Sequence, residues 1–102
     1  MSVPYSEHLD SNRRLAILKL LVEECGTSND SVIELSLREL GHRKELDRAA
    51  VRRLVAELEE RGCVTSEIVR DVVVVVTITQ RGRMAARGDV TIGGIASPHN
   101  GL

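Results

Sequence analysis

The sequence predicts a single α+β domain in which a three-helix core precedes a two-stranded β-hairpin and a short C-terminal helix. Apolar residues recur at helical spacing through roughly the first sixty residues, and the period then changes from about 3.6 to 2. The segment Val72–Thr79 is β-branched throughout, which favours a strand and disfavours a helix. A chain of 102 residues is long enough for one domain and too short for two.

The first helix is predicted over residues 10–25. Asp10 or Ser11 can cap its start, and Gly26 suits the left-handed conformation that ends many helices. A polar turn is expected to follow over Thr27–Ser31. The apolar face of the helix is formed by Leu15, Leu18, Val22 and Cys25, and it is widened by Ile17 and Leu21.

A second and a third helix are predicted close together. Ser31 and Glu34 have the spacing of a capping box at the start of the second helix, which ends at Gly41. After a short charged connection, Asp47 can cap a third helix over residues 48–61. Two helices joined by so short a turn have the spacing of a helix-turn-helix. The third helix has an apolar stripe made of Val51, Leu54, Val55 and Leu58.

The segments Val64–Val69 and Val72–Thr79 are predicted to form a hairpin with Arg70 and Asp71 in its tight turn. Because Val72–Val76 places valine on both faces of its strand, one face is expected to pack on the helices. The other face is available as a dimer or partner surface, or for cover by the N-terminal arm or the tail.

A last short helix is predicted over Arg81–Arg87, with Thr79 as its cap and Gly88 as its stop. The glycine-containing segment after it is expected to be irregular. The expected organisation is an N-terminal arm over residues 1–9, a domain over residues 10–88 and a C-terminal tail over residues 89–102.

Composition excludes several classes of function. The chain has 14 Lys plus Arg and 15 Asp plus Glu, so it is not a polycation that binds nucleic acid by bulk charge. Tyr5 is the only aromatic residue, which argues against RNA-binding modules that stack bases on aromatic side chains. No nucleophile–base pair, phosphate-binding loop or carboxylate pair stands out, so neither enzymatic activity nor a cofactor is expected.

Cys25 and Cys63 are expected to be buried free thiols, because so aliphatic a chain needs no disulfide. No Cys or His pair has the spacing of a zinc site, so no metal is expected. The longest apolar run, Val72–Val76, is far shorter than a membrane span, and the N-terminal segment lacks the pattern of a signal peptide. The expected compartment is therefore the cytoplasm, without a membrane partner.

Two segments carry a resemblance to a known fold family. Leu54–Val64 is similar to the pattern L-x-x-L-x-x-x-G-x-V, and Thr77–Gly82 is similar to L-T-x-x-G with Ile78 at the apolar position. Together with the order of elements, they resemble a winged helix-turn-helix domain over about residues 10–88. The resemblance implies that the third helix is a recognition helix and that the hairpin is a wing.

Four shorter segments, Val3–Leu9, Arg13–Leu15, Asn29–Ser31 and Leu40–His42, resemble a family of small proteins from Mu-like phages and related prophages. Proteins of that family are described as regulators resembling the ArsR family, without an assigned role. The metal site of the ArsR family does not carry over, because its two cysteines one residue apart on the recognition helix have no counterpart here.

Positive charge is concentrated where a helix-turn-helix contacts DNA. Residues 42–56 carry five basic and two acidic side chains. In such a motif the start of the second helix enters the major groove, where arginine can bind guanine. The same arginines also fit an ordinary solvated helix face with pairs such as Arg53–Glu57. The candidate DNA contacts are Arg43, Lys44, Arg48, Arg52, Arg53 and Arg70.

Two functions from different classes follow from these observations. The first is a sequence-specific transcriptional regulator, encoded by a phage or prophage. It would bind double-stranded DNA as a homodimer in the cytoplasm of a bacterial host and read the major groove with the third helix. The second is a winged-helix protein–protein interaction adaptor in phage development or assembly, which binds a phage or host protein and no DNA. DNA titrations across salt concentrations separate the two.

Overall fold

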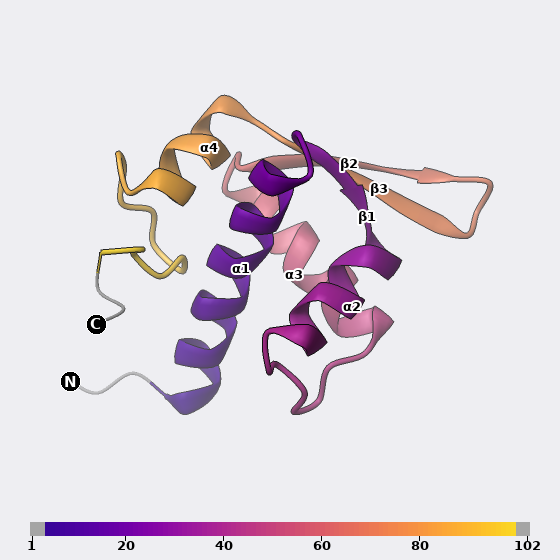
Figure 1. The fold of residues 1–102 in the computed structure, drawn as a ribbon, viewed down its shortest axis with the longest axis horizontal. Coiled ribbons are helices and arrows are strands. Elements are labelled where there is room, and N and C mark those ends of the chain that lie inside the picture. The colour runs from indigo at the N-terminus through magenta and orange to yellow at the C-terminus, as the bar shows by residue number, and fades with distance from the viewer. Residues whose placement is uncertain (1–3, 100–102) are drawn as a thin grey trace.

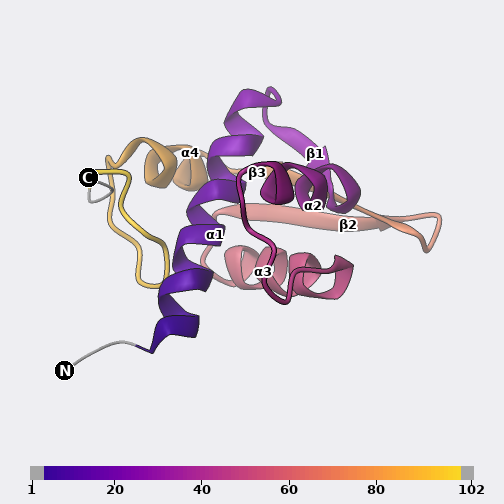
Figure 2. The same ribbon diagram turned by 60° about the horizontal axis from the view of Figure 1, so that its bottom comes forward.

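The computed structural model describes residues 4–99, which form four helices and a three-stranded antiparallel sheet (Figure 1). Strand β3 is central, in the order β1-β3-β2. The β2–β3 hairpin extends past the helices at the end of the molecule opposite α4 (Figures 1 and 2). The elements are α1 (Tyr5–Glu23), β1 (Thr27–Asn29), α2 (Asp30–Glu39), α3 (Arg48–Glu60), β2 (Val64–Val69), β3 (Val73–Ile78) and α4 (Gln80–Arg87).

Helix α1 starts at Tyr5, with Pro4 at its N-cap, and not at Asp10 or Ser11 as predicted. The Pro4 carbonyl accepts hydrogen bonds from backbone N–H groups of the first turn, which extends the helix toward the N-terminus. Residues 5–9, expected to belong to an arm, are therefore helical.

The end of α1 corrects the predicted burial of Cys25. The helix ends at Glu23, and Cys25 and Gly26 adopt left-handed φ angles of 63° and 103° as the chain reverses into β1. This reversal turns Cys25 to solvent, whereas Cys63 is a buried free thiol as predicted. The apolar face of α1 buries Leu15, Ile17, Leu18 and Leu21, while Val22 is exposed.

Strand β1 lies where a polar turn was predicted between the first two helices. Thr27–Asn29 pairs antiparallel with β3, a long-range contact that a three-residue segment does not reveal by its own periodicity. Asn29, and not Ser31, then caps α2, because its side-chain oxygen accepts a hydrogen bond from the Val32 N–H at 3.0 Å. The predicted capping box is therefore wrong, and Glu34 instead binds Arg38 and Arg48.

The other predicted elements are confirmed. Asp47 caps α3 and Thr79 caps α4, each by accepting a hydrogen bond from a backbone N–H, at 2.7 Å and 3.1 Å. Strands β2 and β3 form the predicted hairpin, and Arg70 and Asp71 in its turn have left-handed φ angles of 55° and 57°. A turn of this hand matches the twist of the strands beside it.

The core is aliphatic and lies between the helices and one face of the sheet. Residues 89–99 are irregular, as predicted, but they bury Ile92 and Ile95 and donate the Ala96 N–H to the Ser11 carbonyl at 3.1 Å. Residues 1–3 of the predicted arm and residues 100–102 of the predicted tail lie outside the described residues. No helix among residues 4–99 is long and apolar enough to cross a membrane. The sheet contributes Val64, Val74, Val76 and Ile78 to the core.

Candidate nucleic-acid interface on α3 and the β2–β3 hairpin

The first half of α3 presents the three predicted arginines, Arg48, Arg52 and Arg53, on its solvent-facing side. Their side chains are 45%, 41% and 47% exposed, and Ala49 and Ala56 are exposed beside them. Each arginine forms an ion pair with a carboxylate of the same chain. The sequence predicted only one of these pairs, Arg53–Glu57.

Arg52 connects α3 to both α2 and the hairpin. Its Nε lies 2.8 Å from Oδ2 of Asp30, and its Nη2 donates a hydrogen bond to the Val72 carbonyl at 2.7 Å. Asp30 is fully buried and also accepts the N–H groups of Ser31 and Val74. Burial alone would raise the pKa of Asp30, but the hydrogen bonds from Arg52 and Val74 outweigh it and leave that pKa lowered.

Arg48 is held at its inner end by Glu34 of α2. Its Nε donates to Oε1 of Glu34 at 2.9 Å, and the other carboxylate oxygen of Glu34 binds Arg38 at 3.1 Å. These hydrogen bonds, from Arg48 first and Arg38 second, lower the pKa of Glu34. The two terminal nitrogens of Arg48 have no hydrogen-bond partner among residues 4–99. They are therefore free to bind another molecule.

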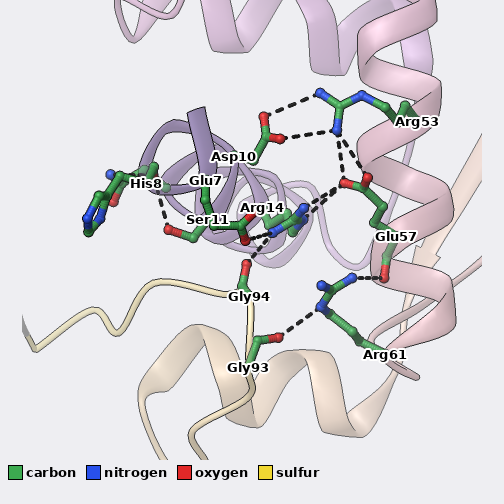
Figure 3. A network of polar contacts seen from close by, with 11 residues as sticks. Glu7, His8, Asp10, Ser11, Arg14, Arg53, Glu57, Arg61, Gly93 and Gly94 are labelled. Carbon is green, nitrogen blue, oxygen red and sulfur yellow. Dashed lines mark hydrogen bonds and ion pairs between the residues drawn. The ribbon is translucent and has the colours of Figure 1, made fainter. Parts of the chain in front are cut away.

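Arg53 joins α3 to α1. It binds Asp10 of α1 at 3.2 Å and Glu57 one turn along α3 at 3.0 Å, and these hydrogen bonds hold its pKa above the ordinary value. Glu57 in turn accepts two hydrogen bonds from the buried Arg14, as Figure 3 shows. Arg14 also donates to the Gly94 carbonyl at 2.6 Å, so the network ends on the C-terminal segment.

The other three predicted contacts lie outside these networks. Arg43 and Lys44 are exposed in the connection between α2 and α3, and Arg70 is exposed at the turn of the β2–β3 hairpin. The Lys44 ammonium lies 5.4 Å from the centre of the Tyr5 ring, so this side chain is directed toward the start of α1. Arg43 and Arg70 have no side-chain hydrogen bond to any residue in the described part of the chain.

The sequence did not predict the carboxylates that bind the arginines of α3, nor the burial of Arg13 and Arg14. Asp30 and Glu34 were assigned to a turn and to a cap, and nothing in the local pattern shows that both face α3. Arg13 is buried and donates to the Lys44 carbonyl at 2.8 Å, which fixes the connection that carries Arg43 and Lys44. The only signal for this in the sequence was the pair Arg13 and Arg14, which comes directly before the apolar face that begins at Leu15.

No three His, Cys, Asp or Glu residues in the described range are grouped so that they can hold a metal ion.

Two curated relatives are similar to the chain. An uncharacterized protein of Haemophilus influenzae is 35% identical over 77 residues, which cover 76% of this chain and 74% of that protein. The protein of Escherichia phage Mu named "Uncharacterized protein gp26" is 34% identical over 90 residues, covering 88% and 91% of the two chains. No protein-family profile and no solved structure matches.

Proposed function

The chain belongs to the family of the phage Mu protein gp26, and we propose that it is a Mu-like phage or prophage regulator. In this proposal it binds duplex DNA, an activity that is argued from the structure below and not from the relative. In this proposal the domain is a winged helix-turn-helix: α3 is the recognition helix, and the β2–β3 hairpin is the wing. The order of α2, α3 and hairpin supports this assignment, as does the contact of Arg52 with Val72, which couples the helix to the hairpin. The protein would act in the cytoplasm of the bacterial host.

The orientation of Arg48 is the observation that carries the proposal. Glu34 binds its Nε and leaves both terminal nitrogens of an exposed guanidinium without a partner among the described residues. A guanidinium held in this way is prepared for bidentate contact with guanine in the major groove or with a phosphate. Ala49, exposed next to it, lets the helix backbone approach DNA closely.

The charges on α3 restrict how the helix meets DNA. Glu59 and Glu60 are exposed in its second half, where they repel a phosphate backbone, whereas the charge of Glu57 is balanced by Arg14 and Arg53. DNA would therefore contact only the first two turns of α3. Arg43, in the connection before α3, and Arg70, at the turn of the hairpin, would bind phosphates on either side of that contact. Because the net charge is -1, non-specific binding is expected to be weak.

Fluorescence anisotropy with labelled duplexes tests the proposal, using random-sequence DNA and tiled fragments of the phage genome at low salt. Arg48→Ala is expected to weaken binding about tenfold, in the range of one lost base contact. The matched control is Arg87→Ala on α4, which removes one positive charge at the opposite end of the molecule and should change affinity less than about twofold. Absence of binding by the wild type, or equal losses in both variants, contradicts the proposal.

A second candidate function, a protein–protein interaction adaptor, is favoured by the apolar tip of the hairpin. Ile68 and Val72 are 64% and 65% exposed, and Val69 is exposed beside them. Such a cluster is suited to contact another protein. Cross-linking in a lysate of infected host cells tests this alternative. The adaptor function is supported if the wild type binds no DNA and is cross-linked to a phage or host protein. The Ile68→Ser variant should then lose this partner, and the Arg48→Ala variant should keep it.

A further inference from the structure

The two edges of the three-stranded sheet end in different ways. On one side, the short strand β1 covers part of β3, and the chain itself binds the next backbone group. The Val74 N–H, which lies past the end of β1, donates to Oδ1 of the buried Asp30 at 3.4 Å. On the other side, β2 pairs with β3 over all of its six residues, and no strand among residues 4–99 pairs with its outer edge. The edge of β2 is therefore the open one.

The hydrogen-bond register determines which backbone groups of β2 face outward. The Cys63 carbonyl, just before β2, accepts the N–H of Thr79, just after β3, at 2.9 Å. Along an antiparallel pair, residues alternate between those that bond to the partner strand and those that do not. Glu67, four residues after Cys63, therefore directs its backbone N–H and C=O to β3. The backbone groups of Ser66 and Ile68 point away from the sheet, and no residue in the described range binds them.

The sequence of β2 does not protect this edge from pairing with another strand. Edge strands of natural proteins are commonly very short, or carry Pro, Lys or a β-bulge that prevents further pairing. Strand β2 contains neither Pro nor Lys, and its register with β3 has no bulge. Four of its residues are exposed: Thr65, Glu67, Ile68 and Val69. The edge can therefore accept a fourth strand through main-chain hydrogen bonds, as in other proteins that bind extended peptides.

The carboxylates beside this edge favour a basic strand. Glu59 of α3 is held on the core-facing side of β2, where its Oε1 accepts the Ser66 hydroxyl at 2.6 Å. Glu67 projects from the opposite face of β2, since successive side chains of a strand alternate between its two faces. Neither glutamate forms an ion pair with another residue of the described range. A basic segment is attracted to such an edge, whereas a second copy of β2 would bring like charges together.

We propose that the open edge of β2 binds an extended segment of another protein in which basic residues alternate with apolar ones. The segment adds a fourth strand to the sheet, and its backbone binds the outward groups of Ser66 and Ile68. A basic side chain of the segment lies beside Glu67 on one face, and an apolar one lies beside Ile68, which is 64% exposed, on the other. This inference rests on the edge of β2 and holds whether or not α3 binds DNA.

An NMR titration of the isotope-labelled protein with the peptide Lys-Val-Lys-Val-Lys-Val-Lys tests the proposal. Strand addition predicts a response that alternates along β2. The amide signals of Ser66 and Ile68 should shift, and their hydrogen exchange should slow at least about tenfold. The amide of Glu67, which already faces β3, should change little. A response without this alternation, or no binding of the peptide, overturns the proposal.

Two control peptides separate strand pairing from charge. Lys-Pro-Lys-Pro-Lys-Pro-Lys keeps the length and the charge but disfavours a paired strand, because proline has no backbone N–H. Glu-Val-Glu-Val-Glu-Val-Glu keeps the pattern and reverses the charge. Neither is expected to produce the alternating response. If the proline peptide binds as tightly as the first peptide, charge alone attracts it, and if the glutamate peptide does, charge does not select the segment. Either result contradicts the proposal.

Two substitutions at position 68 test the backbone contact. Ile68→Pro removes the outward N–H without removing a hydrogen bond to β3, so it should abolish binding of the lysine–valine peptide. Ile68→Ala is the matched control, because it keeps this N–H, and it should change the affinity less than about threefold. Circular dichroism checks that both variants are folded. Equal affinities of the two variants would show that the peptide does not pair with β2.

Two charge reversals test the selection of a basic segment. Glu67→Lys should weaken binding of the lysine–valine peptide about tenfold, since it places like charges side by side. Glu39→Lys, at an exposed position of α2, makes the same change of charge away from the edge and is expected to have a much smaller effect. Equal losses in the two variants would contradict the proposal.

Sedimentation velocity of the wild type tests the alternative occupant of the edge. Wild-type dimers that dissociate in Ile68→Pro would assign the edge to a second copy of the chain and overturn the proposal. A wild type without such dimers supports it. The presence or absence of DNA binding affects none of these measurements, so this proposal and the proposed function fail separately.

Discussion

The arginine face of α3 and the exposed face of α1 differ in whether their charged side chains are paired within the chain. On α3, Arg48, Arg52 and Arg53 each bind a carboxylate supplied by α1, α2 or α3. On α1 and at its C-cap, the exposed side chains of Lys19, Glu23 and Glu24 make no ion pair and no hydrogen bond with any residue in the described range. Internal pairs hold side chains in fixed positions within the chain, whereas exposed charges without a partner are ordinary on a solvated helix. The first surface is thus prearranged by the rest of the fold, and the second is not.

Asp30→Asn is expected to have the largest effect on the prearranged surface. It replaces the buried carboxylate that accepts from Arg52 and Val74, and we expect it to destabilise the fold by about 2–3 kcal/mol. Because the pKa of Asp30 is lowered from 3.8, its charge stabilises the fold above that pH and loses this effect as the pH falls further. Chemical denaturation at neutral and acid pH measures both.

The loss of stability in Asp30→Asn should also be concentrated in one part of the molecule. Because Arg52 joins the same carboxylate to the Val72 carbonyl, hydrogen exchange should rise in the β2–β3 hairpin more than in α4. A uniform rise, or a stability equal to that of the wild type, would show that the face is not organised around Asp30.

Arg53→Ala is expected to have a smaller effect, about 0.5–1 kcal/mol, because its guanidinium is half exposed but belongs to a network with Asp10 and Glu57. Arg87→Ala is the matched control, since within residues 4–99 Arg87 pairs only with Asp89 and both side chains are more than half exposed. Thermal unfolding of the two variants compares them. Equal midpoints would mean that the network adds nothing beyond an ordinary surface pair.

Mild acid is expected to weaken the contact between α1 and the segment that follows α2. His42 accepts a hydrogen bond from Nε of Arg13 at 3.4 Å, and burial, together with the charge of Arg13, lowers its pKa from the ordinary 6.5. The neutral form stabilises the fold above pH 6.5, and this contribution is lost as the pH falls toward the lowered pKa. Urea denaturation across this range should show a smaller pH dependence in His42→Gln, and an unchanged dependence would contradict this account.

Glu23→Gln/Glu24→Gln is expected to change the stability of the monomer least, within about 0.5 kcal/mol, because neither carboxylate has an internal partner in the described range. Chemical denaturation of this variant beside the wild type measures the difference. A large loss of monomer stability would show that these glutamates have an internal structural role.

Local signals in the sequence predicted much of the fold. Asp47 and Thr79 cap helices because an oxygen one position before a helix can reach its free N–H groups, whatever the rest of the chain does. The β-branched run from Val72 forms the central strand for an equally local reason. These features depend on neighbours in sequence and can be read from it.

The features that the sequence did not predict depend on distant partners. The strand at Thr27–Asn29 exists because β3 is available to pair with it. Asn29 displaces Ser31 as the cap because that strand ends at Asn29. The basic character of α3 was visible in the sequence, but its pairing with Asp30 and Glu34 depends on how α2 crosses it. The sequence thus predicted that these arginines lie on an exposed face of α3, and it did not predict their ion pairs with α2.

The salt dependence of DNA binding tests the central claim most directly. For the wild type, the logarithm of the binding constant should fall steeply and linearly with the logarithm of salt concentration. The Arg48→Ala/Arg70→Ala variant should show a slope shallower by about one to two, as expected when one or two phosphate contacts are lost. No binding at the lowest salt, or the same slope in both proteins, would contradict the assignment of this surface to DNA.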